Sequence, residues 1–255
     1  MTAFHGSAFS CPLAANELSG IGQKDVLSVG ATRRAGQVMN GVDTAVQRPL
    51  AVVTAAGSGI GLALAGELAR QGYDLVVAGE NESIGDAANR LSADGAVVYT
   101  VCADLATFDG VEELAASTRA TGRPVAALVL NTGFAAGGDV TRETSLETDL
   151  RMIALNCAGS VHLAKRVLPG MVERGAGRVL FTSSIAAAPG PFHAVYASSN
   201  AFVARLSQAW REELRASGVT VTAFMPGSSS DDPDDVAHEA VVALLAAKER
   251  VIPGS

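Results

Sequence analysis

The sequence predicts an α/β protein whose single domain is a doubly wound, seven-stranded parallel sheet with helices on both faces. Two observations lead to this prediction. Strand-like and helix-like segments alternate seven times from Leu50 onward, and most of the strand-like segments are continuous apolar runs. Such runs are typical of parallel strands that helices cover on both sides. The length of 255 residues, 48% of them apolar, suits one large domain with a full core.

The expected elements alternate along the chain. The strands are expected at 50–54, 74–78, 97–101, 125–130, 178–182, 219–225 and 250–252. The helices are expected from the end of a glycine-rich loop to about 71, and at 82–94, 109–120, 145–174, 196–216 and 234–247. Right-handed crossovers between such strands place the ligand crevice at their carboxyl ends. Residues 1–48 have no sustained period, so we expect a flexible extension there and a domain at 49–255.

Composition argues against several functions. The chain has 19 basic and 26 acidic side chains and a net charge of −7, so we expect no nucleic-acid partner. It has neither a signal peptide nor the run of about 18 apolar residues that a membrane helix needs, which predicts a cytoplasmic protein without a membrane partner. Cys11, Cys102 and Cys157 lie far apart without metal-ligand spacing, so no metal site is expected.

Three glycines, Gly57, Gly59 and Gly61, lie between the first strand and the first helix. Glycine suits this position because the backbone turns tightly and approaches a pyrophosphate closely, with the helix N-terminus facing the negative charge. A glycine cluster alone is weak evidence, but the strand–loop–helix context predicts a Rossmann-type nucleotide site.

From about residue 50 to 254 the chain resembles the classical short-chain dehydrogenase/reductase family. The glycine motif is matched by residues 54–61, with Ala55 in place of the family's first glycine, and half of an Asn-Asn-Ala-Gly motif remains at 130–133. The resemblance implies an NAD(P) cofactor and Asn131 in a largely structural role. The cofactor-binding residues that it implies are Thr54, Gly57, Ser58, Gly59, Ile60, Gly61, Glu80, Asp104, Leu105, Asn131, Gly133, Pro226 and Gly227.

The resemblance also implies a catalytic set, with one departure from the family pattern. Tyr196 corresponds to the proton-donating tyrosine, Ser184 to the serine that polarises the substrate oxygen, and Asn156 to the helix asparagine. The family's Tyr-x-x-x-Lys is Tyr196-x-x-x-Asn200 here, so an amide that could bond ribose replaces an ammonium that lowers the phenol pKa. An ordinary phenol, with a pKa of about 10, is ionised to only about one part in a thousand at pH 7. We therefore expect alcohol oxidation to suffer more than carbonyl reduction.

Several nearby residues offer alternatives. The loop before Tyr196 is one residue shorter than usual for the family, which keeps Ser183 open as the serine. His193 is either an acid or relay, or a solvent-facing loop residue, with the second reading favoured. Nothing in the sequence supports Arg178 or Arg205 as a substitute cation. The link after Gly227 is also short, which leaves the crevice open, and its acidic residues suit a helix N-terminus better than a metal site.

The choice between the two nicotinamide cofactors depends on Glu80 and Ser58. Both occupy positions where family members that use NADP often carry basic residues, and a carboxylate repels a 2′-phosphate. NAD is therefore favoured over NADP, although the NAD-selecting aspartate usually lies one position earlier, at Gly79.

Three functions remain open from the sequence. The first is an NAD(P)-dependent oxidoreductase that interconverts a carbonyl and a secondary alcohol of a small molecule, with modified proton transfer. The second is a catalytically degenerate member that acts as a partner subunit or sensor, and the third is a non-redox enzyme on the same scaffold. By analogy with the family, the long helices at 145–174 and 196–216 pair into a homo-oligomer (a dimer or tetramer), or under the second reading into a hetero-oligomer with an active relative.

Overall fold

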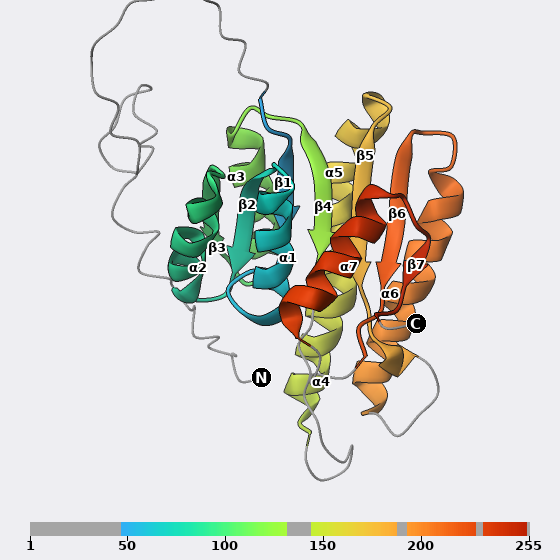
Figure 1. Ribbon diagram of the computed structural model, residues 1–255. Coiled ribbons are helices and arrows are strands. Elements are labelled where there is room, and N and C mark those ends of the chain that lie inside the picture. Colours follow the sequence, from blue (N-terminus) through green and yellow to red (C-terminus); the bar gives the residue numbers. More distant parts are fainter. Residues whose placement is uncertain (1–46, 132–143, 188–192, 228–231, 254–255) are drawn as a thin grey trace, which may run out of the picture. The chain divides into compact units, whose positions relative to one another are not determined.

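The computed structural model describes residues 47–131, 144–187, 193–227 and 232–253. Its strands form one parallel sheet of seven in the order β3-β2-β1-β4-β5-β6-β7, side by side from one edge to the other in Figure 1. The described residues from Arg48 onward belong to one compact unit. The predicted doubly wound, seven-stranded parallel sheet is confirmed.

The strands are short, buried and rich in Val, Leu and Ala. They are β1 (Leu50–Val53), β2 (Asp74–Gly79), β3 (Val98–Cys102), β4 (Val125–Leu130), β5 (Gly177–Thr182), β6 (Val219–Phe224) and β7 (Arg250–Val251). The α-helices are α1 (Gly59–Arg70), α2 (Ser83–Leu91), α3 (Phe108–Ala120), α4 (Leu146–Ile153), α5 (Ser160–Glu173), α6 (Ala194–Glu213) and α7 (Pro233–Leu245). The 3-10 turns η2 (Ser92–Asp94) and η4 (Ile185–Ala187) and the π-helical η3 (Ala154–Gly159) complete the described elements.

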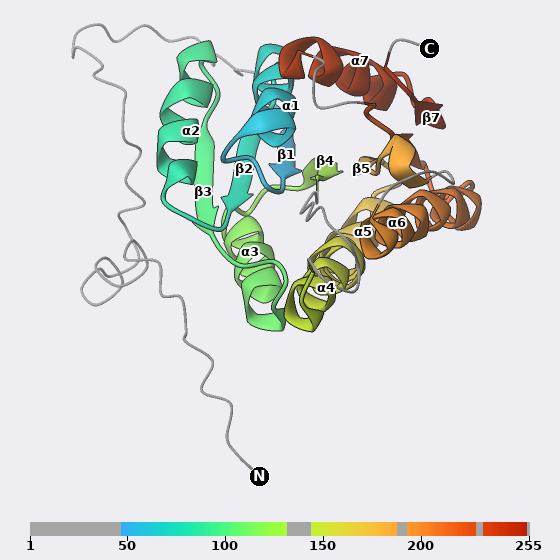
Figure 2. The ribbon, with the colours of Figure 1, turned by 90° about the horizontal axis from the view of Figure 1, so that it is seen from below.

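Helices cover both faces of the sheet, as Figure 2 shows. Helices α3, α5 and α6 contribute Leu114, Leu163 and Trp210 to one apolar core, whereas α1, α2 and α7 contribute to the other. Alternate residues of a strand point to opposite faces, so Phe181 enters the first core and Leu180 the second. This double burial explains why the strands are apolar throughout.

The helix expected at 145–174 differs from the prediction in its middle. The chain is helical from 146 to 173, but residues 154–159 form a π-helical segment between α4 and α5. Such segments often lie at functional sites because they change which side chains face a neighbour. Asn156 lies in this segment.

The strand order reverses between β1 and β4, which pair with each other although β2 and β3 lie between them in the sequence. The chain leaves β1 toward one side and β4 toward the other, so the two loops diverge above their carboxyl ends. In open α/β sheets ligands bind at this point. The fold therefore places the glycine-rich loop and Asn131 together at the expected crevice.

The acidic residues before α7 cap a helix, as expected for those that the structure describes. Asp232 is the N-cap, and its Oδ1 accepts a hydrogen bond of 2.9 Å from the Asp234 N–H. Carboxylates in this position compensate the positive end of the helix dipole.

Candidate functional site

A pocket of about 220 Å³ opens at the carboxyl ends of β1, β2 and β4. Its lining comes from the glycine-rich loop, from the ends of these strands and from the segment after β3. The residues are Thr54, Ala55, Gly57, Ser58, Ala78, Gly79, Glu80, Asn81, Ser83, Ala103, Leu105, Asn131 and Leu155. The structure thus brings together six of the predicted cofactor residues: Thr54, Gly57, Ser58, Glu80, Leu105 and Asn131.

Close backbone approach explains why the loop needs glycine at Gly61. A Cβ atom there would lie 2.0 Å from the Ala55 carbonyl oxygen and 2.7 Å from Asn131 Nδ2. The loop therefore folds against the residue that follows β4. Thr54 reinforces this contact, because its buried hydroxyl accepts a hydrogen bond of 3.0 Å from the Asn131 N–H. These contacts place Asn131 against the glycine-rich loop.

The start of α1 leaves hydrogen-bond donors open beside the pocket. Its N-cap, Ser58, makes no side-chain cap, and the first turn contains no acidic residue. Free N–H groups and the helix dipole at such an end favour an anion. Together with the glycine cradle, this end fits the pyrophosphate of a dinucleotide. Gly59, Ile60 and Gly61 belong to the turn without lining the pocket itself.

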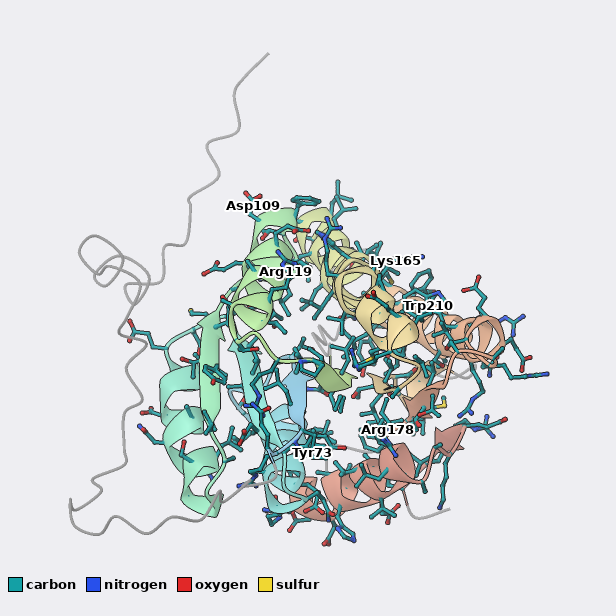
Figure 3. The ribbon with its side chains drawn as sticks, turned by 90° about the horizontal axis from the view of Figure 1, so that it is seen from above. Tyr73, Asp109, Arg119, Lys165, Arg178 and Trp210 are labelled. Atoms are coloured by element: carbon teal, nitrogen blue, oxygen red, sulfur yellow. The ribbon has the colours of Figure 1, made fainter. Side chains whose placement is uncertain are left out.

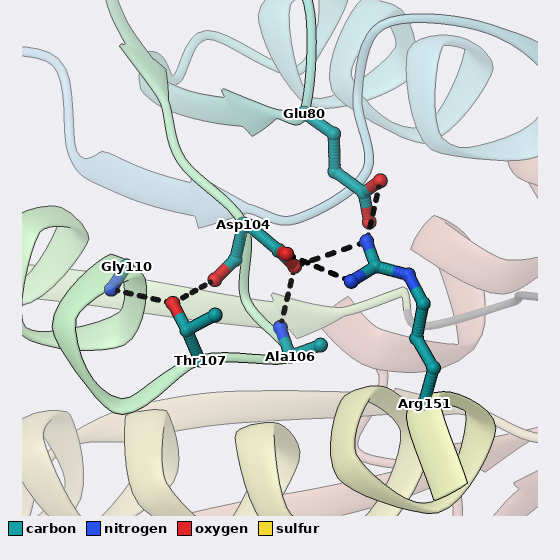
Figure 4. Close-up of polar contacts among 6 residues, drawn as sticks. All are labelled: Glu80, Asp104, Ala106, Thr107, Gly110 and Arg151. Atoms are coloured by element: carbon teal, nitrogen blue, oxygen red, sulfur yellow. Dashed lines mark hydrogen bonds and ion pairs between the residues drawn. The ribbon is translucent and has the colours of Figure 1, made fainter. Parts of the chain in front are cut away.

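Two carboxylates and one guanidinium meet at Glu80, which lines the pocket (Figure 4). Arg151 of α4 lies 2.8 Å (Nη1) and 3.2 Å (Nη2) from the two carboxylate oxygens of Asp104, and its Nη2 lies 3.0 Å from Glu80 Oε2. Asp104 Oδ1 also accepts a hydrogen bond of 2.9 Å from the Ala106 N–H. Burial alone raises the pKa of Asp104, but the hydrogen bonds from Arg151 and Ala106 outweigh burial and hold that pKa below its ordinary value.

The predicted catalytic residues of α6 and the π-helical segment belong to one hydrogen-bonded cluster. Asn156 Nδ2 donates to Ser199 Oγ at 3.1 Å, and Ser199 Oγ donates to the Tyr196 carbonyl oxygen at 2.9 Å. Asn200 Nδ2 donates to the same carbonyl oxygen at 2.9 Å, so the amide points back along its own helix. Asn156 Oδ1 is buried without a hydrogen-bond partner among the described residues. The cluster is polar and contains no charged side chain.

The two serines after β5 have different partners. Ser183 Oγ donates to the Asn200 carbonyl oxygen at 2.9 Å, which ties the strand end to α6. Ser184 Oγ accepts from the Ala186 N–H at 3.1 Å in the turn η4, which packs on α6. The Ser183 hydroxyl is thus committed to holding the helix. This favours Ser184 as the serine that faces substrate.

Within the described part of the chain, neither Arg178, Arg205 nor any lysine replaces the missing lysine of the motif. Lys165 is exposed on α5, and Arg178 lies at the amino end of β5 on the α7 side of the sheet, opposite the end that carries Ser184 (Figure 3). Arg205 is exposed on α6 and bonds Gln208, and Lys248 is exposed beyond α7. Lys24 falls outside the described residues.

His193 is not a solvent-facing loop residue, which corrects the reading that the sequence favoured. Its side chain is only 4% exposed, and its Nδ1 accepts a hydrogen bond of 3.4 Å from the Tyr196 N–H as the N-cap of α6. Its Nε2 lies 3.3 Å from Thr144 Oγ1 and 3.7 Å from Asp149 Oδ1. Both ring nitrogens are therefore engaged in fixing the start of the helix that carries Tyr196.

The remaining predictions concern Gly133, Pro226 and Gly227. Gly133 lies outside the described residues. Pro226 and Gly227 follow β6 and are partly buried, and the Pro226 carbonyl oxygen accepts a hydrogen bond of 3.2 Å from the Ile185 N–H. In the described ranges no three potential metal ligands cluster, and no helix is both long and apolar enough to cross a bilayer.

Sequence reasoning missed two residues of this site, Arg151 and Ser199. Arg151 lies 47 residues from Asp104 and 71 from Glu80, and the tertiary fold alone brings the three side chains together. Ser199 had a local signal, since it directly precedes Asn200 in the helix that carries Tyr196.

Comparison with known proteins identifies the class to which this site belongs. A family model described as short chain dehydrogenase matches residues 49–234. The chain belongs to the short-chain dehydrogenase family, whose members are oxidoreductases that bind NAD or NADP. The glycine cradle and the open α1 N-terminus fit that cofactor.

Individual relatives agree with this assignment. An uncharacterized oxidoreductase of Staphylococcus saprophyticus is 32% identical over 216 residues, which cover 78% of this chain and 92% of the relative. The bulky-bulky ketone specific alcohol dehydrogenase from Comamonas testosteroni has a similar structure, with a TM-score of 0.77, 25% identity, and 82% and 87% of the two chains covered. A short-chain dehydrogenase from Sphingobium yanoikuyae in complex with NADPH gives a TM-score of 0.75 at 28% identity, covering 81% and 88%.

Proposed function

We propose that this protein is an NAD(P)-dependent oxidoreductase that interconverts a carbonyl and a secondary alcohol, working mainly as a reductase. The observation that carries the proposal is the hydrogen-bonded cluster of Asn156, Ser199, Tyr196 and Asn200, which lies at the same edge of the sheet as the nucleotide pocket. When bound, the reduced cofactor supplies the hydride.

Each residue of the cluster takes a role that its surroundings permit. The Tyr196 phenol donates a proton to the carbonyl oxygen, and the Ser184 hydroxyl bonds and polarises that oxygen. Ser183 bonds the Asn200 carbonyl oxygen and His193 caps the N-terminus of α6. Both residues therefore position Tyr196. Asn156 Oδ1, buried and without a partner in the described residues, suits a water that relays a proton to the site. Asn200, one turn after Tyr196 in α6, bonds the nicotinamide ribose of the cofactor.

The uncharged cluster favours the proton-donating form of the Tyr196 phenol. Carbonyl reduction needs a neutral phenol that gives a proton, whereas alcohol oxidation needs a phenolate that accepts one. A lysine ammonium would stabilise the phenolate, and Asn200 supplies no such charge. Reduction therefore tolerates the substitution better than oxidation does.

Glu80 supports a preference for NAD over NADP. Its side chain is 46% exposed at the end of β2 and lines the nucleotide pocket, while no cation lines that pocket among the described residues. A carboxylate there accepts a hydrogen bond from a ribose hydroxyl and repels a phosphate. The bound NADPH of the Sphingobium yanoikuyae enzyme shows what that relative accepts, and the titration below decides the preference of this chain.

The first test is a titration of the purified protein with NADH and then with NADPH, followed by nicotinamide fluorescence. Saturable binding that is tighter for NADH supports the proposal. A Tyr196→Phe variant should keep this binding and lose carbonyl reduction. Absence of binding of either cofactor at millimolar concentration would rule the oxidoreductase out.

One observation favours a second candidate, a degenerate family member that acts as a partner subunit or sensor. Within the described part of the chain, the hydrogen bonds of Asn156, Ser199 and Asn200 involve no lysine or arginine. Under this alternative the protein binds the cofactor, wild type and Tyr196→Phe are equally inactive on carbonyl substrates, and a partner function survives the substitution.

A further inference from the structure

We propose that Arg151 is a specificity-determining residue of the nucleotide site: Glu80 and Asp104 hold its guanidinium, and Glu80 thereby keeps it from binding a ribose 2′-phosphate. The inference deepens the proposed function, because it assumes that the pocket beside Glu80 receives an adenosine. It assigns a role to a side chain from α4, an element outside the strand-end loops that line most of the pocket.

The contacts show a guanidinium whose two terminal nitrogens both bond carboxylates. Nη1 bonds Asp104, and Nη2 is shared between Asp104 at 3.2 Å and Glu80 at 3.0 Å. Glu80 follows β2, Asp104 follows β3 and Arg151 lies on α4, so the bridge joins three elements (Figure 4). Nη2 donates one N–H to each carboxylate, so neither of its two N–H groups is left for a phosphate while Glu80 stays in place.

The charges of the three side chains decide which ribose the site accepts. One guanidinium against two carboxylates leaves one net negative charge. A ribose with a free 2′-hydroxyl brings no charge and can donate to Glu80. A 2′-phosphate brings further negative charge and must either approach that net charge or displace Glu80 from Arg151.

Asp104 holds Arg151 by more hydrogen bonds than Glu80 does. Asp104 bonds it through both carboxylate oxygens and is itself fixed by the Ala106 N–H, whereas Glu80 makes a single contact and is 46% exposed. Loss of the Glu80 charge therefore leaves Arg151 anchored on Asp104, with Nη2 turned toward the position that Glu80 occupied. A substitution of Glu80 therefore leaves Arg151 in place and makes its charge available to a ligand.

The experiment measures nucleotide binding rather than turnover. Isothermal titration calorimetry on the full-length protein uses adenosine 5′-monophosphate and adenosine 2′,5′-bisphosphate as probes, which differ in the 2′-phosphate. We expect wild type to favour the monophosphate, and Glu80→Gln to raise the relative affinity for the bisphosphate by about tenfold or more. The double variant Glu80→Gln with Arg151→Gln should lose this gain, because the cation that binds the phosphate is gone.

Matched controls separate this role from a general charge effect. Arg215 and Glu212 form an exposed ion pair on the α6 side of the molecule, so Glu212→Gln and Arg215→Gln change the net charge equally. Neither control should change the ratio of the two affinities. Arg151→Lys keeps a charge but loses the two-pronged geometry, and in the Glu80→Gln background it should retain only part of the gain.

Three results would overturn the inference. The Glu80→Gln variant could leave the affinity ratio unchanged, its gain could persist without Arg151, or the control variants could reproduce it. Each of these, with the monophosphate still bound, removes the role of Arg151 and leaves the proposed oxidoreductase intact. Failure of wild type to bind either probe, or NADH, would remove the nucleotide site and both proposals with it.

Discussion

At the scale of single residues, Ala55 stands out because its backbone adopts a left-handed conformation. Its φ angle is 51°, in the region that glycine enters without cost, and it occupies the position of the first glycine in the family's motif. For a residue with a Cβ atom, this conformation costs about 1 kcal/mol or more. At Ala55 the chain therefore has a non-glycine residue in a conformation that glycine would adopt without strain.

Replacing Ala55 by glycine should therefore stabilise the protein by about 0.5–1 kcal/mol, because strain in the native state is relieved while the unfolded chain gains some entropy. Urea unfolding followed by circular dichroism measures the change. Gly61→Ala is the matched substitution in the same loop, and the close Ala55 carbonyl oxygen should make it strongly destabilising. Equal effects of the two substitutions would contradict this account of the loop.

Asn200 is the second informative residue, because it replaces the lysine of the catalytic motif. Asn200→Lys should raise the kcat of alcohol oxidation at neutral pH about tenfold or more and change the kcat of carbonyl reduction less, since an ammonium near Tyr196 favours the phenolate. Initial rates in both directions with the same cofactor provide the measurement. Asn200→Gln lengthens the side chain without adding charge and should give no such increase. A lysine variant that binds cofactor and gains nothing in either direction would point to the degenerate family member.

At the scale of elements, a buried carboxylate joins α1 to α7. Glu67 is 4% exposed, and its carboxylate accepts hydrogen bonds of 2.9 Å from both Arg70 Nε and Gln71 Nε2. His238 of α7 lies 3.1 Å from the same carboxylate. Burial raises the pKa of Glu67, but the hydrogen bonds together outweigh it and hold the pKa below its ordinary value.

A lowered pKa makes this carboxylate a source of stability above its ordinary titration range, near pH 4.3, and this stability is lost as the pH falls through the folded-state pKa. Glu67→Gln should therefore lower the free energy of unfolding at pH 7 by about 1–3 kcal/mol. The difference from wild type should shrink in unfolding curves recorded below pH 4. The exposed Glu113 provides the control, since Glu113→Gln should change stability little at either pH. A pH-independent difference at Glu67 would show that packing rather than charge is responsible.

At the scale of the whole molecule, α4 exposes an apolar stripe. Leu146, Leu150 and Ile153 are 74%, 55% and 45% exposed, and their spacing places them on one side of the helix. Phe202 of the neighbouring α6 is 43% exposed. Exposed apolar residues grouped in this way are typical of protein–protein contacts, which supports the expected homo-oligomer through these two helices.

Leu150→Glu should reduce the apparent mass in analytical ultracentrifugation from that of a dimer or tetramer toward that of a single chain, because a charge at a buried contact is costly. Val97, 50% exposed ahead of β3, is the control site, and Val97→Glu should leave the mass unchanged. A wild-type protein that sediments as a single chain would refute the oligomer.

The sequence alone determined the order and type of the elements. Apolar runs of strand length, glycines directly after the first strand and a helix with Tyr196 and Asn200 one turn apart are local patterns, and local backbone preferences and burial fix them. They suffice for the parallel sheet, the position of the crevice and six of the thirteen residues that line its pocket. The π-helical segment around Asn156 escaped prediction, because the helical pattern in the sequence does not specify which hydrogen bonds close each turn.

Only the tertiary structure decided which side chains meet. Arg151 bridges Glu80 and Asp104 from a helix far along the chain, His193 turns inward to cap α6, and Ser183 rather than Ser184 commits its hydroxyl to that helix. Each of these contacts depends on how separate elements pack and which rotamers the packing allows. The spacing of residues along the chain does not specify either. The sequence therefore located the candidate nucleotide site, and the packing of α4 and α6 against the sheet decided which charges and hydrogen bonds meet within it.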